Sequence, residues 1–135
     1  GASEIIDRHS LDDKSGKGLL PGRWIAALDT VSGNTLSTIL RSTIDRGIVC
    51  NCGMIASSTL DVPVFPFILR AVRLIGIASA DTPMTRRLDI WKLITDKLIP
   101  ENIESMCHVV TLNEVQHELN LMLEGKQSGK VLVKL

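Results

Sequence analysis

Aromatic residues are scarce in this chain of 135 residues: they make up 3% of it, and tyrosine does not occur. Proteins that bind single-stranded nucleic acid stack the bases on aromatic side chains, so this composition disfavours that class. An excess of charge of one sign is also lacking, because fifteen acidic residues balance fifteen basic ones. Without a strongly basic surface, we expect neither nucleic acid nor an anionic membrane as a partner.

Long hydrophobic runs and numerous cysteines are missing as well. No apolar run reaches the roughly 18 to 20 residues that cross a bilayer, and no secretory signal pattern opens the chain. Three cysteines are few and odd in number, which argues against a disulfide framework and fits a reducing compartment. We therefore expect a soluble, cytoplasmic protein.

What the sequence does contain is a pattern of alternating elements. Hydrophobic residues make up 44% of the chain, enough to bury the core of one domain. Short β-type runs alternate with helical patterns, which predicts an α/β fold with a mainly parallel sheet. Three nearly continuous apolar runs predict central strands covered by helices on both faces. These runs are Trp24–Leu28, Ile48–Cys52 and Leu74–Ala78.

Two helical segments are expected between these strands. The first begins at Gly33-Asn34 and ends at Gly47, with apolar residues at helical spacing. Those residues are Leu36, Ile39, Leu40 and Ile44. The second is the short segment Pro66–Arg70, whose proline suits a first helical turn and which forms a tight crossover into the third strand.

Two more helices and a strand are expected after the third strand. Thr82-Pro83 has the composition of a helix start, and a helix should run from there to Pro100. Its apolar face is formed by Leu88, Trp91, Ile94 and Leu98. Thr111–Glu114 reads as a capping box, and Gly125 ends the helix that follows it. A short strand over Val131–Leu135 is predicted last.

The first part of the chain departs from this regular alternation. Gly1–Asp7 predicts a turn and a short strand, Glu4–Ile6, and Asp12–Gly22 predicts a flexible loop. The glycine fingerprint G-x-G-x-x-G, which sits on the first strand-helix turn of a doubly wound dinucleotide fold, does not occur. We therefore expect a chain that begins in mid-domain, with the first half of the fold missing or never present.

Candidate binding residues follow the predicted strands, because ligands of open α/β sheets bind beyond the carboxyl ends of the strands. The turn Asp29–Gly33 leads into a helix whose N-terminus could face a phosphate or ribose, and an ordinary capped turn is an equal alternative. Gly53, between Cys52 and Met54, allows close approach to the backbone, although a simple turn glycine explains it too. Phe67–Leu69 and Ile77–Ser79 form an apolar wall, for which plain core packing is the alternative.

Metal and nucleophile sites are not predicted. Cys50 and Cys52 are two residues apart on one face of a strand, whereas structural zinc sites use pairs such as C-x-x-C on turns. Cys107-His108 has no second pair at motif spacing, and no serine or cysteine nucleophile has a recognisable setting. No hydrolase is implied, and we assign neither a catalytic residue nor a metal ligand to this chain.

Four segments carry a resemblance to a known family. In order they are WIAALDTVSGN (24–34), GIVCNCGM (47–54), PVFPFILRAVRLIGI (63–77) and GKVLVKL (129–135). The chain resembles the zinc-free medium-chain dehydrogenase/reductase superfamily, in its quinone oxidoreductase and acryloyl-coenzyme A reductase branch. The resemblance implies an N-terminal GroES-like catalytic domain followed by a Rossmann domain. That Rossmann domain binds NADPH and delivers hydride to a quinone or to an activated enoyl- or acryloyl-type double bond.

The resemblance also implies how this chain fits such an enzyme. Residues 1–135 would form one partial Rossmann-like domain, the C-terminal half of the doubly wound parallel sheet plus a C-terminal helix and strand. Residues 103–135 would return toward the absent catalytic domain. By similarity, ten residues are expected near the cofactor: Thr30, Val31, Cys52, Gly53, Met54, Phe67, Ile68, Leu69, Ser79 and Lys130. Phe67–Leu69 would be the backbone clamp on the nicotinamide carboxamide.

Departures from the family pattern shape what we expect of the isolated chain. Ala78 stands where relatives carry a polar residue near the pocket, and the glycine fingerprint is absent. We expect the chain alone to bind cofactor weakly and to be inactive. The strand over 73–79 lies at a sheet edge in relatives, which implies a homodimer, and the edge at Trp24–Asp29 would recruit another chain. The alternative function is a non-enzymatic α/β module for oligomerisation or partner binding.

Overall fold

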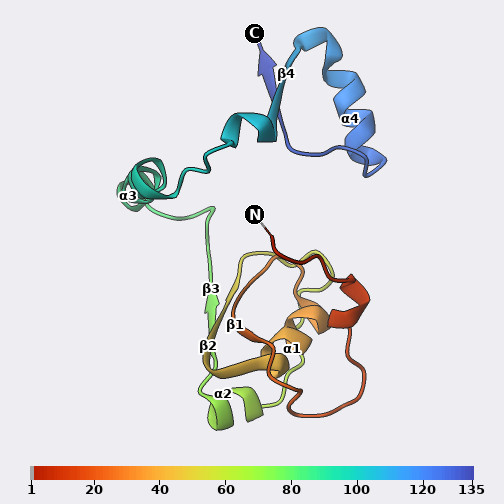
Figure 1. Ribbon diagram of the computed structural model, residues 1–135, viewed down its shortest axis with the longest axis vertical. Helices are drawn as coiled ribbons and strands as arrows, with labels where there is room; N and C mark the ends of the chain where they lie inside the picture. Colours follow the sequence, from red (N-terminus) through yellow and green to blue (C-terminus); the bar gives the residue numbers. More distant parts are fainter. Residues whose placement is uncertain (1) are drawn as a thin grey trace. The chain divides into compact units, whose positions relative to one another are not determined.

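The computed structural model describes residues 2–135, which form two compact units divided between Thr82 and Pro83 (Figure 1). The first unit contains a three-stranded sheet and two α-helices, and the second contains a two-stranded sheet and two α-helices. The expected α/β class is therefore confirmed. That residues 1–135 act as one partial domain stays a prediction.

The sheet of the first unit is parallel throughout. Its strands are β1 (Trp24–Asp29), β2 (Thr43–Asn51) and β3 (Arg73–Gly76), in the spatial order β1-β2-β3. The register pairs Asp29 with Asn51 and Asn51 with Gly76. Because the strands are parallel and in this register, their carboxyl ends meet at one edge of the sheet. The β1 and β3 edges have no further strand among the described residues.

The helices of this unit cover one face of the sheet. α1 (Gly33–Ser42) connects β1 to β2, and α2 (Phe65–Arg70) precedes β3. Both crossovers run in the same direction across the sheet, so right-handed connections place both helices on the same face, where they contact each other. The core lies beneath them and consists of Leu36, Ile39, Leu40, Val49 and Val72.

The other face of the sheet corrects one expectation. Covering on both faces was predicted, yet Leu28 of β1 and Ile75 of β3, which the register places on either side of Cys50, are 68% and 45% exposed. The physical reason is the common direction of the two crossovers, which leaves no helix of the first unit for the second face. The continuous apolar runs were thus correct indicators of strands and wrong indicators of burial.

The end of α1 corrects a second expectation. Ile44 was predicted within the helix and Gly47 at its end, but α1 ends at Ser42 and β2 begins at Thr43. The Thr43 hydroxyl donates to the Ile39 carbonyl at 2.8 Å, and Thr43 takes an extended backbone. The β1–β2 register shifts just after this point, and Arg46 has φ 59°. An irregular entry to the strand therefore replaces the last helical turn.

Residues 2–23, which precede β1, contain no strand, and Gly1 of the predicted turn lies outside the described residues. Glu4–Ile6 was predicted as a strand, but the structure has a short 3₁₀ helix over Arg8–Leu11 instead. Asp7 caps it, because its carboxylate accepts the His9 N–H at 2.7 Å. Residues 12–22 form the expected loop without regular structure. It is anchored, since Arg70 donates to the Leu20 carbonyl at 2.8 Å.

The second unit confirms the predicted helices and last strand. α3 (Met84–Leu93) continues as a π-helical segment (Ile94–Leu98), and α4 (Val115–Leu123) follows the capping box, which Thr111 and Glu114 form as expected. β5 (Lys130–Lys134) pairs in parallel with β4 (Cys107–Thr111), a strand that was not predicted. A short 3₁₀ turn, Ile103–Met106, precedes β4.

The start of α3 differs from the prediction. Pro83, not Thr82, occupies the cap position, and no side chain caps the helix. The Thr82 hydroxyl instead donates to the Ala78 carbonyl at 3.0 Å. Across residues 2–135, no helix combines the length and the apolar character needed to cross a membrane.

Candidate functional site

A groove of about 520 Å³ lies at the carboxyl ends of β2 and β3. The register explains it, because Asn51 and Gly76 are paired as the last residues of these strands. The chain segments that follow the two strands form its walls. The residues that line the groove are Asn51, Cys52, Gly53, Met54, Gly76, Ile77 and Ala78. This is the position at which open α/β sheets bind their ligands.

Close packing of two backbone segments shapes one side of the groove. A Cβ atom placed on Gly53 would overlap the Thr30 carbonyl group, so only glycine lets the two segments approach this closely. Thr30 is exposed, and the Val31 carbonyl accepts the Ala56 N–H at 2.8 Å. The structure thus brings the predicted residues Thr30, Val31 and Gly53 together.

A buried carboxylate organises the ends of β1 and β2. Asp29 is 3% exposed, and its Oδ2 accepts the Ser32 N–H at 2.8 Å and the Asn51 side-chain amide at 2.7 Å. The same Asn51 nitrogen donates to the Gly53 carbonyl at 2.9 Å. The Cys52 N–H also donates to the Asp29 carbonyl, at 2.9 Å. The two strand ends and the segment after β2 therefore form one hydrogen-bonded assembly.

The N-terminus of α1 makes several contacts within the chain. Ser32 is 6% exposed and forms a bridge with Ser57, and Gly33 is buried against the Ser57 side chain. Asp29 thus holds an ordinary turn before the helix. That this turn also faces a phosphate or ribose stays a prediction.

Other predicted residues lie outside the groove. Phe67, Ile68 and Leu69 belong to α2, which leads into the amino end of β3, at the opposite end of the sheet. Phe67 packs on the core, and Ile68 and Leu69 are 68% and 62% exposed. Ser79 directly follows Ala78 of the groove and is exposed. Lys130 is the first residue of β5 in the second unit.

Sequence reasoning missed three contributors to this site. Asn51 and Gly76 line the groove, and Asp29 was considered only as part of a turn. Their signal was available in the register: each is the last residue of a parallel strand. The predicted strands ended one to two residues later or earlier, which hid that correspondence.

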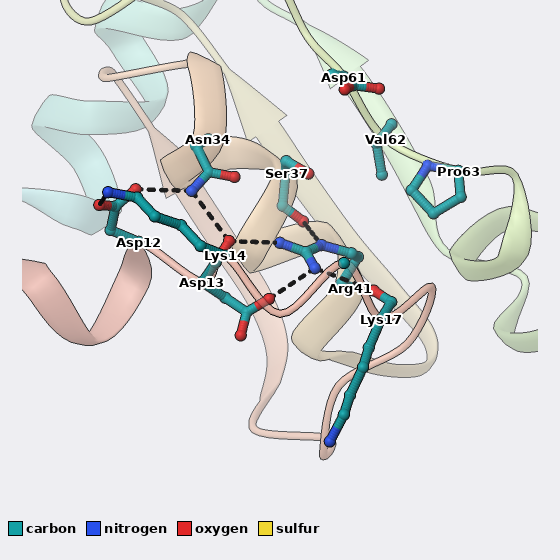
Figure 2. Close-up of a pocket in the computed structure, with 11 residues that line it drawn as sticks. Asp12, Asp13, Lys14, Lys17, Asn34, Ser37, Arg41, Asp61, Val62 and Pro63 are labelled. Carbon is teal, nitrogen blue, oxygen red and sulfur yellow. Dashed lines mark hydrogen bonds and ion pairs between the residues drawn. The ribbon is translucent and has the colours of Figure 1, made fainter.

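A second, polar pocket lies between the loop 12–22 and α1 (Figure 2). Its volume is about 580 Å³, and its lining includes Asp12, Lys14, Lys17, Asn34 and Asp61. Figure 2 shows that the side chains at its centre bond to one another across the space between loop and helix.

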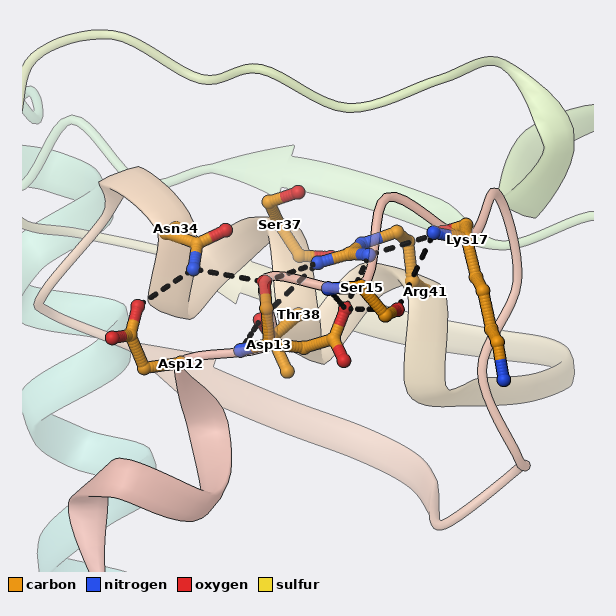
Figure 3. Close-up of polar contacts among 8 residues, drawn as sticks. All are labelled: Asp12, Asp13, Ser15, Lys17, Asn34, Ser37, Thr38 and Arg41. Carbon is orange, nitrogen blue, oxygen red and sulfur yellow. Dashed lines mark hydrogen bonds and ion pairs between the residues drawn. The ribbon is translucent and has the colours of Figure 1, made fainter.

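Arg41 occupies the centre of this polar pocket (Figure 3). Its side chain is 5% exposed, and it donates to the Asp13 carboxylate at 2.8 Å and to the Lys17 carbonyl at 3.0 Å. The hydrogen bond from the Ser15 side chain is the main cause that lowers the pKa of Asp13 below its ordinary value; burial opposes it, and the hydrogen bond from Arg41 adds to the lowering. Since Arg41 directs its donors to groups of the chain itself, we interpret this pocket as the anchor of the loop.

Residues 2–135 contain no cluster of three or more His, Cys, Asp or Glu side chains that could hold a metal ion. Cys50, Cys52 and Cys107 are free thiols. The prediction that the intact enzyme uses no metal rests on the resemblance and stays a prediction.

Two known bacterial proteins are similar to the chain along its whole length. A Bacillus subtilis protein named as a quinone oxidoreductase, YhfP, is 34% identical over 136 residues, and an Escherichia coli protein named as an acrylyl-CoA reductase, AcuI, is 32% identical over 137. All of this chain is covered in both alignments, but only 41% of each relative. No protein-family model matches the chain.

Solved structures give the same result. The crystal structure of Bacillus subtilis YhfP with NAD bound superposes with a TM-score of 0.90 at 34% identity, covering 100% of this chain and 41% of that one. The Escherichia coli YhdH structure with bound NADPH has a TM-score of 0.84 at 32% identity, covering 99% and 41%. The chain thus spans about two fifths of the length of the relatives that it matches.

Proposed function

This chain belongs to the zinc-free medium-chain dehydrogenase/reductase superfamily, and from that premise we propose that it is part of an NADPH-dependent reductase. The reductase transfers hydride to a quinone or to an activated enoyl- or acryloyl-type double bond. Support comes from relatives named as quinone oxidoreductase and acrylyl-CoA reductase, which match the chain over its full length. The chain by itself is proposed to be inactive.

The groove after β2 and β3 is proposed to hold part of the nicotinamide cofactor. The observation that carries this proposal is the position of the groove, at the carboxyl ends of two adjacent parallel strands and with Gly53 and Gly76 in its lining. Cys52, Gly53 and Met54 would contact the cofactor, with Thr30 and Val31 behind them. A bound NAD(P)H supplies the hydride. The volume of about 520 Å³ suits one portion of a dinucleotide.

The remaining predicted contacts with the cofactor come from residues that do not line the groove. Ser79 adjoins the groove at Ala78, and Lys130 and Phe67–Leu69 are proposed from the family resemblance alone. NADPH is proposed as the cofactor from the family resemblance, and relatives have been solved with NAD and with NADPH. A homodimer through the β3 edge and a cytoplasmic location are also proposed.

A partner-binding module is the second candidate function. The observation that favours it is the uncovered face of the first sheet, where Leu28 and Ile75 are exposed. Exposed apolar side chains that cluster on a sheet face are typical of a surface that another protein segment covers.

Titration with NADPH, followed by nucleotide fluorescence, tests the proposed function. Gly76→Val is the informative variant, because a Cβ at this groove position meets open space and valine suits a strand. We expect it to weaken NADPH binding about tenfold or more. Ala26→Val in β1, outside the groove, is the matched control and should bind like the unmodified chain.

Two results would count against the proposal. Equal affinity of the Gly76→Val variant would remove the groove from the cofactor site. If the unmodified chain showed no saturable NADPH binding up to about 1 mM, this result would favour the partner-binding module.

A further inference from the structure

Asn51 connects the buried end of β1 with the unstructured segment that lines the groove. We propose that Asn51, oriented by Asp29, is a positioning residue that holds the backbone of Cys52–Met54 in the geometry that receives the cofactor. The inference rests on the proposed function for the identity of the ligand. Its structural part concerns this chain alone.

The amide of Asn51 uses both of its hydrogens. Its Nδ2 donates to Asp29 Oδ2 at 2.7 Å and to the Gly53 carbonyl at 2.9 Å. Only a group with two hydrogens on one atom can serve two acceptors in this arrangement, so neither aspartate nor a small apolar residue reproduces it. The side chain therefore acts as a bridge with a defined direction, from carboxylate to carbonyl.

Asp29 determines the direction of that bridge. It is 3% exposed, and its Oδ2 also accepts the Ser32 N–H at 2.8 Å. A buried carboxylate is costly unless donors surround it, and the Ser32 and Asn51 groups are those donors. The charge attracts the amide nitrogen of Asn51, so the flipped orientation, with the amide oxygen toward Asp29, is disfavoured.

The segment that Asn51 holds has no other regular support. Residues 52–54 belong to no helix or strand, and the Cys52 and Ala56 N–H groups donate to the carbonyls of Asp29 and Val31. Between these two anchors, the bond from Asn51 to Gly53 fixes the peptide that faces Thr30. A preorganised backbone binds a ligand more tightly, because less conformational entropy is lost on binding.

Two variants separate positioning from stability. In Asn51→Ala, both bonds of the bridge are lost. In the double exchange Asp29→Asn with Asn51→Asp, the bond between positions 29 and 51 can form again with donor and acceptor reversed. The new aspartate cannot donate to the Gly53 carbonyl. The double variant thus restores the link between the strands but not the link to the groove.

The measurements are NADPH titration, thermal unfolding and amide hydrogen exchange at Cys52 and Ala56. We expect Asn51→Ala to weaken NADPH binding about tenfold and to raise exchange at these amides. The double variant should unfold at a temperature near that of the unmodified chain, yet keep the tenfold weaker binding. Recovery of both stability and affinity in the double variant would overturn the inference, as would unchanged binding in Asn51→Ala.

Failure of the proposed function gives a different result from failure of the inference. If the unmodified chain does not bind NADPH, the cofactor assignment fails, and hydrogen exchange decides the inference. Faster exchange at Cys52 and Ala56 in both variants supports a positioning role for Asn51. Exchange equal to that of the unmodified chain overturns it.

Discussion

Both units of this chain contain helices with an apolar face, but the two units differ in how far these faces are buried. In the first unit, α1 is buried from Leu36 to Ser42 and packs on the sheet through Leu36, Ile39 and Leu40. In the second unit, α3 and α4 bury no residue, and Val110 of β4 is the buried hydrophobic side chain there among the described residues. Helical periodicity therefore predicts that a helix forms, and not that its apolar face is covered.

The connections explain the difference. α1 connects two adjacent parallel strands, so the chain must cross the sheet, and the apolar face of the helix packs against it. α3 is less amphipathic than α1, and Leu88 and Trp91 of its apolar stripe are each 61% exposed. Because burial of apolar surface dominates folding free energy, we expect the first unit to supply most of the stability of the chain.

The largest predicted effect tests this comparison directly. Leu40 is fully buried, so Leu40→Ala should lower the free energy of unfolding by about 3 kcal/mol. Leu119 of α4 is 45% exposed, and Leu119→Ala should cost less than about 1 kcal/mol. Urea unfolding, combined with amide hydrogen exchange measured separately in each unit, would give the loss of unfolding free energy for both variants. Equal costs at the two positions would mean that the second unit has a core of its own.

The next effect compares a buried with an exposed arginine. Arg41 is 5% exposed and anchors the loop 12–22, so Arg41→Met should cost about 2 kcal/mol and increase proteolysis within the loop. Arg46 also pairs with a carboxylate, but its side chain is 83% exposed. Arg46→Met should therefore change stability by less than about 0.5 kcal/mol. A loop as resistant to protease in Arg41→Met as in the unmodified chain would show that Arg41 does not anchor it.

The smallest predicted effect is the loss of the Glu114 capping interaction at low pH. The Thr111 N–H and hydroxyl, in that order, lower the pKa of Glu114 below its ordinary value of 4.5. A lowered pKa means that the ionised form is favoured in the folded state. Its contribution is complete above pH 4.5 and is lost as the pH falls through the lowered pKa. Asp13 in the first unit behaves in the same direction.

An NMR titration of the Glu114 carboxyl group, with α4 amide shifts, measures this effect. Glu114→Gln should remove the acid dependence of the start of α4, while the loop near Asp13 keeps its own. A Glu114 titration midpoint at or above 4.5 would contradict the capping interaction.

Much of the architecture could be predicted from the sequence. The capping box at Thr111 and Glu114 and the strand after Ser128-Gly129 are local signals, and the structure confirms them. The end of α1 could not be predicted, because pairing with β1 at Ala26 and Ile48 competes with the last helical turn. β4 was missed since Cys107–Thr111 has no clear alternation and gains its pairing from β5, about twenty residues away.

The residues of the candidate site also include some that could be predicted from the sequence and some that could not. Cys52, Gly53 and Met54 were predicted from their place after a strand, and the structure places them in the groove. Asn51 and Asp29 were not predicted as partners, because they lie 22 residues apart and only strand pairing joins them.

The sequence by itself determined the α/β class, the parallel strands and the family, because these depend on local periodicity and on the order of short motifs. Only the tertiary structure decided which apolar faces are covered, that Ser32 pairs with Ser57, and that Asn51 bridges Asp29 and Gly53. The physical reason is that burial and hydrogen bonding depend on which distant segments meet. That is determined by the direction of the crossovers and by the strand register, and no local pattern encodes either.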